Sequence, residues 1–106
     1  MSKHLVILTG REEDEAELLG RRVRLARQRR GLTQAEVADR AGLARATVGA
    51  LEAGRPSISL AGLLTILSVL GLQGTIADAL SHDELGEEIE MSSRQRVKAP
   101  RLVADF

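Results

Sequence analysis

The feature that most constrains this chain is a group of small and apolar residues at fixed offsets within residues 33–55. Ala38 is small where two helices would cross closely, and Gly42 favours the left-handed conformation that a tight turn needs. Leu43, Val48 and Leu51 supply apolar side chains that pack beneath the turn and the helix after it. An ordinary amphipathic hairpin does not need all of these residue types at these offsets together. The segment therefore predicts two short helices joined by a tight turn.

The first of these helices is predicted to start at Thr33. Thr33 and Glu36 have the spacing of a capping box, in which each side chain accepts a hydrogen bond from the other residue's backbone amide. The second helix is predicted to run from residue 44 or 45 to Glu52. Such a unit lets a small protein place its second helix in the major groove of DNA.

Two further helices are expected on either side of this unit. One begins near residues 11–14, where acidic side chains favour a helix N-terminus, and it stops at Gly31. The other is capped by Ser57 or Ser59 and stops at Gly71. Its apolar stripe comprises Leu60, Leu63, Leu64, Ile66, Leu67 and Leu70. The fold class is therefore predicted to be all-α.

The remaining segments complete the predicted organisation. Residues 75–80 are interpreted as a fifth helix rather than a strand, because Thr75 and Asp78 also have capping-box spacing. The polar and basic composition of residues 92–106 predicts a flexible C-terminal tail. We therefore expect an N-terminal arm or short strand at 1–10, a five-helix domain at 11–80, and an acidic then basic extension at 81–106.

Composition argues against several classes of function. The chain has no cysteine, which excludes disulfides and thiolate metal sites, and its two histidines have no further ligand set. No nucleophile–base pair or glycine-rich phosphate loop is visible, so we expect neither an enzyme nor a cofactor. No apolar run approaches the roughly 18 residues of a membrane-spanning helix. The apolar stretch near the start is too short for a secretory signal, so a cytoplasmic protein is expected.

The net charge is zero, but the charges are unevenly distributed. Residues 20–55 carry nine arginines against three acidic residues, a net charge of +6, whereas residues 1–19 and 56–106 each carry −3. Because salt screens charges beyond roughly 8–10 Å, local charge governs phosphate binding more than the total does. The basic segment therefore favours nucleic acid as a partner. The alternative is that these arginines only solvate a helix face.

The motif residues also resemble a known family. The resemblance rests on Thr33-Gln34-Ala35-Glu36-Val37-Ala38, Gly42-Leu43, Val48 and Leu51-Glu52-Ala53-Gly54, which are similar to the Xre/Cro/cI helix-turn-helix family of phage repressors and bacterial regulators. It covers about residues 18–80. It implies a phage-repressor-like domain that binds double-stranded DNA as a homodimer, at an operator with two half-sites. The apolar faces of the fifth helix and of residues 5–8 are the expected dimer surfaces.

The resemblance also implies roles in DNA binding. Base edges are read at the start of the second motif helix, where Arg45 is suited to bond guanine O6 and N7 together. The alternative for Arg45 is a phosphate contact only. Gln34 resembles a family glutamine that sits at a phosphate, with a solvated side chain as its alternative. The predicted DNA-binding residues are Thr33, Gln34, Ala44, Arg45, Ala46, Thr47, Gly49, Ala50 and Arg55.

A second group of residues is predicted to be structural. Arg27 and Glu52 occupy positions that pair as a salt bridge in phage repressors, and the alternative is two separate surface charges. The predicted structural residues are Arg27, Ala38, Gly42, Val48, Leu51 and Glu52. Candidate phosphate contacts, not all of which can face DNA at once, are Arg21, Arg22, Arg24, Arg29 and Arg30.

Longer segments narrow the resemblance. Residues 18–30 and 56–72, with Asp83-Glu84-Leu85-Gly86, resemble HipB-like antitoxins, which are regulators found beside HipA-type kinase toxins. The leading hypothesis is therefore a sequence-specific DNA-binding transcriptional repressor that is the antitoxin and autoregulator of a toxin–antitoxin operon, with a HipA-like kinase toxin as partner. The alternatives are a stand-alone Xre-family regulator without a toxin and a protein-interaction module that uses the fold without DNA.

Overall fold

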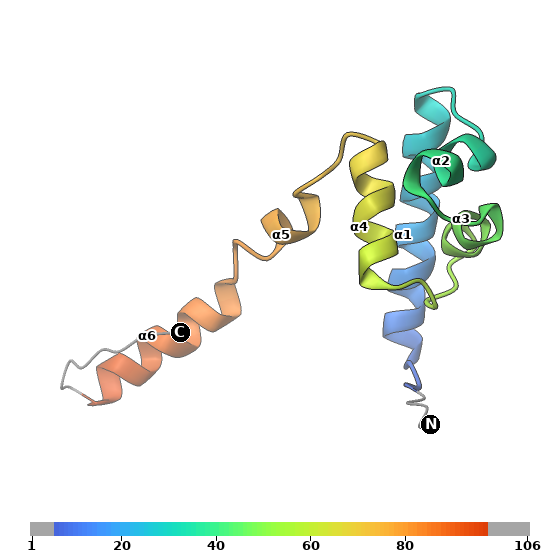
Figure 1. Cartoon of the computed structure of the whole chain (residues 1–106). Helices are drawn as coiled ribbons and strands as arrows, with labels where there is room; N and C mark the ends of the chain where they lie inside the picture. The colour runs from blue at the N-terminus through green and yellow to red at the C-terminus, as the bar shows by residue number, and fades with distance from the viewer. Residues whose placement is uncertain (1–5, 98–106) are drawn as a thin grey trace, which may run out of the picture. The chain divides into compact units, whose positions relative to one another are not determined.

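The computed structural model describes residues 6–97 of the 106-residue chain, and all of its regular structure there is α-helical. The predicted all-α class is therefore confirmed, with one helix more than the five expected. The chain divides into two compact units, Met1–Gln73 and Gly74–Phe106. The first contains α1 (Gly10–Arg29), α2 (Gln34–Ala41), α3 (Arg45–Glu52) and α4 (Leu60–Val69), and the second contains α5 (Thr75–Ala79) and α6 (Glu84–Val97) (Figure 1). No helix of the described residues is long and apolar enough to cross a membrane.

The N-terminus of α1 is set by a capping box. Thr9 is the N-cap, and its backbone amide donates to Glu12 Oε1 at 3.0 Å. The hydrogen bonds from the Thr9 side chain and backbone hold the pKa of Glu12 below its usual value. Residues 6–9 have no regular structure, so the strand alternative for the N-terminal arm is wrong there. Residues 1–5 lie outside the described part of the chain.

Helix α4 begins at Ser59, one of the two serines expected to cap it. Ser59 Oγ accepts a hydrogen bond from the Gly62 amide at 3.0 Å. Ile66 is fully buried, but Leu60 and Leu64 are 65% and 46% exposed. The predicted apolar stripe is therefore only partly buried, because it is wider than the surface that the other helices cover.

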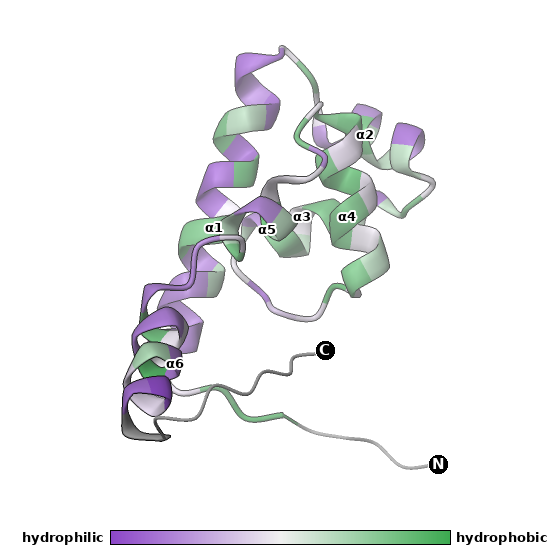
Figure 2. Ribbon diagram, turned by 90° about the vertical axis from the view of Figure 1, so that its left-hand side faces the viewer, coloured by the Kyte–Doolittle hydropathy of each residue, from purple (hydrophilic) through white to green (hydrophobic). Residues whose placement is uncertain are grey.

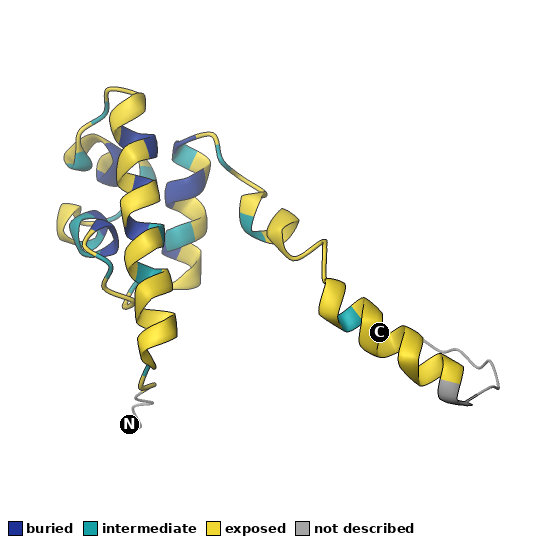
Figure 3. Cartoon of the chain, turned by 180° about the vertical axis from the view of Figure 1, so that it is seen from behind, coloured by how far each residue is buried: buried dark blue, intermediate teal, exposed yellow. Residues whose placement is uncertain are grey.

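The core of the first unit is aliphatic. Helix α3 packs on α1 and α2, and α4 packs on α2. Figure 2 shows α4 as strongly hydrophobic and much of α1 as hydrophilic, and Figure 3 shows that the buried residues of α1 occupy a minority of its length. The buried apolar side chains are Val23, Ala26, Val37, Ala38, Val48, Leu51, Ile66, Leu67 and Leu70.

The second unit consists of two helices. Residues 75–79 are helical, as expected, but the N-cap is Gly74, with φ of 87°, rather than Thr75. Helix α6 starts after Asp83, whose Oδ1 accepts a hydrogen bond from the Gly86 amide at 3.0 Å. Residues 92–97, predicted as tail, belong to α6, where Arg94 donates to Glu90 at 2.9 Å one turn earlier. The predicted tail boundary at residue 92 is therefore wrong, and residues 98–106 lie outside the described part.

Helices α1 and α3 approach each other closely at Gly20. A Cβ atom added to Gly20 would lie 2.8 Å from the Glu52 carbonyl oxygen and 3.0 Å from the Gly54 amide nitrogen. Gly54 faces α1 in return, since a Cβ there would lie 2.8 Å from Glu17 Cγ. Because the three atoms nearest this position, the carbonyl oxygens of Leu51 and Glu52 and the amide nitrogen of Gly54, are all backbone atoms, no side-chain rotation relieves the contact. The close packing of α1 against the end of α3 therefore requires glycine at position 20.

Gly20→Ala is expected to destabilise the protein, because the new methyl group must push α1 away from the end of α3. Overpacking usually costs roughly 1–3 kcal/mol. Because the atoms in the way are backbone atoms, this cost is expected to exceed the gain of about 1 kcal/mol in helix propensity. Urea denaturation followed by circular dichroism measures the change. Gly10→Ala is the control, because nothing lies within 4 Å of a Cβ there. Equal stability of the Gly20→Ala protein and the wild type would contradict this account of the contact.

Candidate nucleic-acid interface

The unit of α2, turn and α3 is defined locally by Thr33 and Gly42. Thr33 is the N-cap of α2: its Oγ1 accepts from the Glu36 amide at 3.0 Å, and Glu36 Oε1 accepts from the Thr33 amide at 2.8 Å. Gly42 ends α2 with φ of 70° and ψ of 31°, a left-handed conformation that costs glycine little. The Leu43 amide donates to the Ala38 carbonyl at 2.9 Å, which closes the turn.

The small and apolar residues of the motif lie beneath this turn. Ala38, Val48 and Leu51 are only 2%, 0% and 3% exposed. Leu43 is partly buried. The structure thus places α3 with one side against α1 and α2 and the other side open to solvent.

A buried charged pair joins this unit to α1. Arg27 donates from Nε to Glu52 Oε2 at 2.6 Å and from Nη2 to Glu52 Oε1 at 2.8 Å. Arg27 Nη1 also donates to the Leu32 carbonyl at 2.8 Å, and Gln34 Nε2 donates to Glu52 Oε1 at 3.0 Å. The two charges are therefore paired rather than separate on the surface. One network connects α1, the loop before α2, the first turn of α2 and the last turn of α3.

The pair stays ionised although both side chains are buried. Burial alone raises the pKa of Glu52, but hydrogen bonds from Arg27 and Gln34, with the charges of Arg27 and Arg24, lower the pKa by more. The net pKa of Glu52 lies below its usual value. The same hydrogen bond to Glu52 raises the pKa of Arg27. Hydrogen bonds between two charged groups in this bidentate form are among the strongest in proteins.

The open side of α3 consists of small side chains around one arginine. Arg45 and Glu52 are the only charged residues of α3, and Glu52 is buried, so Arg45 supplies the only charge on the exposed side. Ala44 is the N-cap of α3. Of the predicted reading positions, the exposed ones are Ala44, Arg45 and Ala46, and the half-buried ones are Thr47, Gly49 and Ala50. The helix therefore presents a face that can approach a flat or grooved partner closely.

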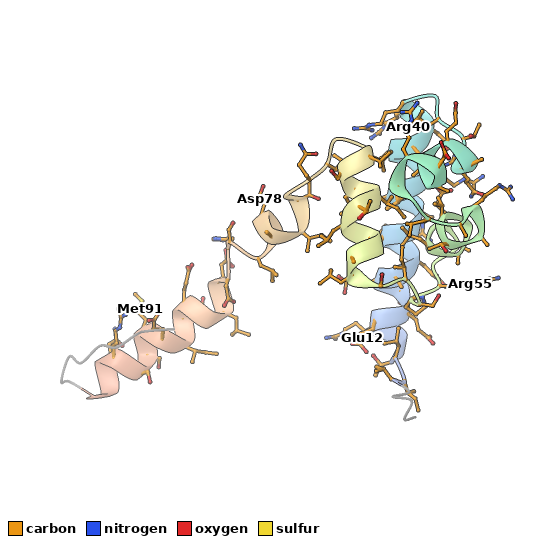
Figure 4. All side chains as sticks on the ribbon, viewed as in Figure 1. Glu12, Arg40, Arg55, Asp78 and Met91 are labelled. Carbon is orange, nitrogen blue, oxygen red and sulfur yellow. The ribbon has the colours of Figure 1, made fainter. Side chains whose placement is uncertain are left out.

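The loop after α3 extends this face. Arg55 is exposed and lies at the start of that loop (Figure 4). A shallow hollow of about 340 Å³ is lined by Ala46, Thr47, Ala50, Arg55, Ser57 and Ile58. Ser57 and Ile58 are absent from the predicted site, because the sequence offers only a possible capping role for Ser57 and no spacing that marks this loop. The structure thus brings Arg55 to one surface with three predicted positions of α3 and two positions of the loop that were not predicted.

This arrangement of helices also corresponds to a known protein family. Residues 18–80 match the family described as helix-turn-helix domain. The chain belongs to the helix-turn-helix domain family. A search of curated proteins finds no match. A helix-turn-helix domain indicates a DNA-binding regulator, and such domains place the second helix of the unit, here α3, in the major groove.

In this helix-turn-helix domain Gln34 lies between the buried pair and the open side of α3. Its amide nitrogen donates to Glu52, and its Oε1 lies 3.5 Å from the position that a Cβ on Gly49 would take. The Gln34 side chain therefore lies against Gly49, and Gly49 offers little surface of its own. Because a side-chain amide has two N–H donors, the hydrogen bond to Glu52 uses only one of the two that Gln34 carries.

The arginines of α1 do not share one side of the helix-turn-helix domain. Gly20 and Arg27 face α3, and each residue turns the helix by about 100°. Arg22 and Arg29 therefore lie on the side of α1 opposite α3. Arg24 is close enough to lower the pKa of Glu52. Of the α1 arginines predicted to contact phosphates, Arg24 thus lies nearest to α3.

Glu52→Gln is expected to lower the free energy of unfolding at pH 7 by about 3–5 kcal/mol, because it leaves the Arg27 charge buried without its counter-charge. The pKa of Glu52 is lower in the folded protein than its ordinary 4.5, so the stability it contributes is present above that pH and is lost on acidification. The difference between variant and wild type should therefore shrink below about pH 4.5. Urea denaturation at pH 7 and pH 3 measures both effects.

The exposed residue Glu88 supplies the control, because Glu88→Gln removes one carboxylate without touching a buried partner. It should leave the stability at pH 7 unchanged. A difference between Glu52→Gln and the wild type that stays constant down to pH 3 would contradict the role assigned to the ionised pair.

Proposed function

We propose that the protein is a sequence-specific DNA-binding transcriptional repressor that binds an operator with two half-sites as a homodimer. The observation that supports this most directly is the open side of α3, on which Arg45 stands as the one charge among small side chains. The network of Arg27, Glu52 and Gln34 holds that helix against the body. A repressor of this kind acts by occupying its operator.

Reading of the half-site is assigned to the first turn of α3. Arg45 bonds guanine through both its outer nitrogens, and the small Ala46 and the methyl group of Thr47 contact thymine methyl groups. Thr33 and Arg55 are exposed on the flanking segments and contact phosphates. Few side chains then read bases directly, so the shape and deformability of the operator supply the rest of the specificity.

Charge supports the same partner. Residues 20–55 hold a net charge of +6, and both α2 and α3 lie within this segment. Neutralising DNA phosphates releases condensed counterions, so the affinity should fall as salt rises. This term contributes to binding on any sequence, whereas Arg45 contributes to discrimination between sequences.

Arg45→Ala is expected to weaken binding to the operator by roughly 1–3 kcal/mol while affecting unrelated DNA much less. The reason is that the substitution removes a bidentate base contact as well as one charge. Fluorescence anisotropy with operator and scrambled duplexes at one fixed salt concentration measures both affinities, after the operator has been found by mapping bound genomic DNA.

Arg22→Ala is the matched control, because it removes the same charge from the side of α1 opposite α3. It should change the two affinities little and equally. Equal losses on both duplexes with Arg45→Ala would assign Arg45 to a phosphate instead of a base.

A second candidate function extends the first: the repressor also neutralises a HipA-like kinase toxin as its antitoxin. It is supported by the sequence resemblance and by the second unit. None of residues 74–95 of this unit is buried. Leu85 and Ile89 are 68% and 60% exposed, and they line a hollow of about 450 Å³ on one side of α6. An apolar surface of this kind suits a protein partner.

Replacing Leu85 and Ile89 together by serine is expected to abolish neutralisation of a co-expressed kinase toxin from the neighbouring gene, while binding to the operator is retained. Met91→Ser is the control, since Met91 is 58% exposed and lies on the opposite side of α6. Growth of cells that express the kinase measures neutralisation. If the kinase is equally toxic with and without the wild-type protein, the stand-alone regulator is the correct function.

A further inference from the structure

The longest uncharged stretch of the chain covers α4 and the segments on both sides of it. Residues 56–77 contain no aspartate, glutamate, lysine or arginine, although 28% of the whole chain is charged. A surface helix ordinarily carries charged side chains on its solvent side. Figure 2 shows α4 without the strongly hydrophilic colours of α1 and α6. Helix α4 therefore lacks the residues that would mark its outer side as permanently solvated.

Within the first unit, the outer side of α4 is not covered by the other helices. Gly62, Ile66 and Leu67 turn inward and are buried. Leu60 and Leu64, one turn apart, are 65% and 46% exposed. We call this surface the α4 face, and its residues are Leu60, Ala61, Leu64, Thr65 and Ser68, all of which are exposed.

The α4 face is suited to packing against another helix. Thr65 Oγ1 already donates to the Ala61 carbonyl at 2.8 Å, so this hydroxyl group loses little when water is removed. Ala61 and Ser68 are small enough to let a second helix come close. Leu60 and Leu64 then supply the apolar area whose burial stabilises the contact.

The charge of the rest of the first unit indicates what covers the α4 face. Residues 20–55 carry a net charge of +6, so two copies repel each other when those surfaces meet. Across the uncharged α4 face two copies approach without that repulsion. We propose that the α4 face packs against the α4 face of a second copy of this chain. The proposal deepens the proposed function, because it names the surface that joins the two DNA-binding units of the homodimer.

The spacing of the face residues makes it self-complementary. Leu60, Leu64 and Ser68 follow each other at intervals of four residues and form one ridge along α4. With antiparallel helices and the two-fold axis at Leu64, Leu64 meets Leu64 of the second copy, and Leu60 meets its Ser68. In this contact a large side chain faces a small one. The two-fold symmetry makes the same contact occur twice. The proposed main contact is therefore α4, whereas the sequence predicts the fifth helix and residues 5–8 as dimer surfaces.

The test places like charges on the proposed axis. Leu64→Arg brings two arginines together at the centre of the contact, and it is expected to weaken self-association of the full chain by at least about 100-fold. Sedimentation equilibrium without DNA measures the association. Leu25→Arg is the matched control, because Leu25 lies on α1, is 45% exposed, and the substitution changes the charge by the same amount. It should associate like the wild type.

Mixing two variants of opposite charge tests the geometry of the contact, and it distinguishes a lost contact from a misfolded protein. Leu64→Glu is expected to be monomeric by itself, and an equimolar mixture of the Leu64→Arg and Leu64→Glu proteins should form heterodimers. Circular dichroism establishes that each variant is folded. If Leu64→Arg is not, a mixture of the Leu60→Arg and Ser68→Glu proteins takes its place, because residue 60 of one copy faces residue 68 of the other, and this mixture should associate more strongly than either protein alone. The proposal is overturned if the wild type is monomeric at every concentration, if Leu25→Arg is as damaging as Leu64→Arg, or if the folded mixture does not associate.

DNA binding separates this proposal from the proposed function. A folded, monomeric Leu64→Arg protein should bind a duplex with one half-site like the wild type, and should lose the gain in affinity that the second half-site gives. A wild type that dimerises as described but binds no DNA would refute the function and leave the α4 contact intact. A wild type that gains affinity from two half-sites while Leu64→Arg gains as much would refute the α4 contact and leave the function intact.

Discussion

The arrangement of the first three helices depends on the buried pair of Arg27 and Glu52. The core around it is aliphatic, and the chain's only aromatic residue is Phe106. Leu, Val, Ile and Ala side chains give cohesion but little direction, because their contacts are non-directional. Two parallel N–H···O bonds between planar groups have a defined geometry. The pair therefore supplies the orientation of α3 that the apolar core leaves open.

The pair and the glycine contact act at the same place. Gly20 brings the backbone of α1 against the Glu52 carbonyl. Two turns further along α1, Arg27 donates two hydrogen bonds to the Glu52 carboxylate. Backbone contact and side-chain bonding thus hold one residue from two sides. Gln34 adds the start of α2 to the same carboxylate, which couples the N-terminus of α2 to the C-terminus of α3.

Local signals made much of this predictable from the sequence. Thr33 with Glu36 and the left-handed Gly42 act within a few residues, and the structure has both where the sequence predicts them. The partnership of Arg27 and Glu52 spans 25 residues and was accessible only through family resemblance. The hollow beside Ser57 and Ile58 depends on how a loop folds back on α3, which no spacing encodes. Composition also misplaced the start of the tail, because the Glu90–Arg94 ion pair lies within a helix that continues to Val97.

The exposure of Ala44, Arg45 and Ala46 has a consequence for how such a protein changes over time. These residues form the first part of the open side of α3, whereas Val48, Leu51 and Glu52 hold the helix in place. The positions proposed to read DNA are thus separate from those that maintain the fold. Descendants of one ancestral domain can exchange the exposed residues and acquire different operators, while the scaffold beneath is inherited unaltered.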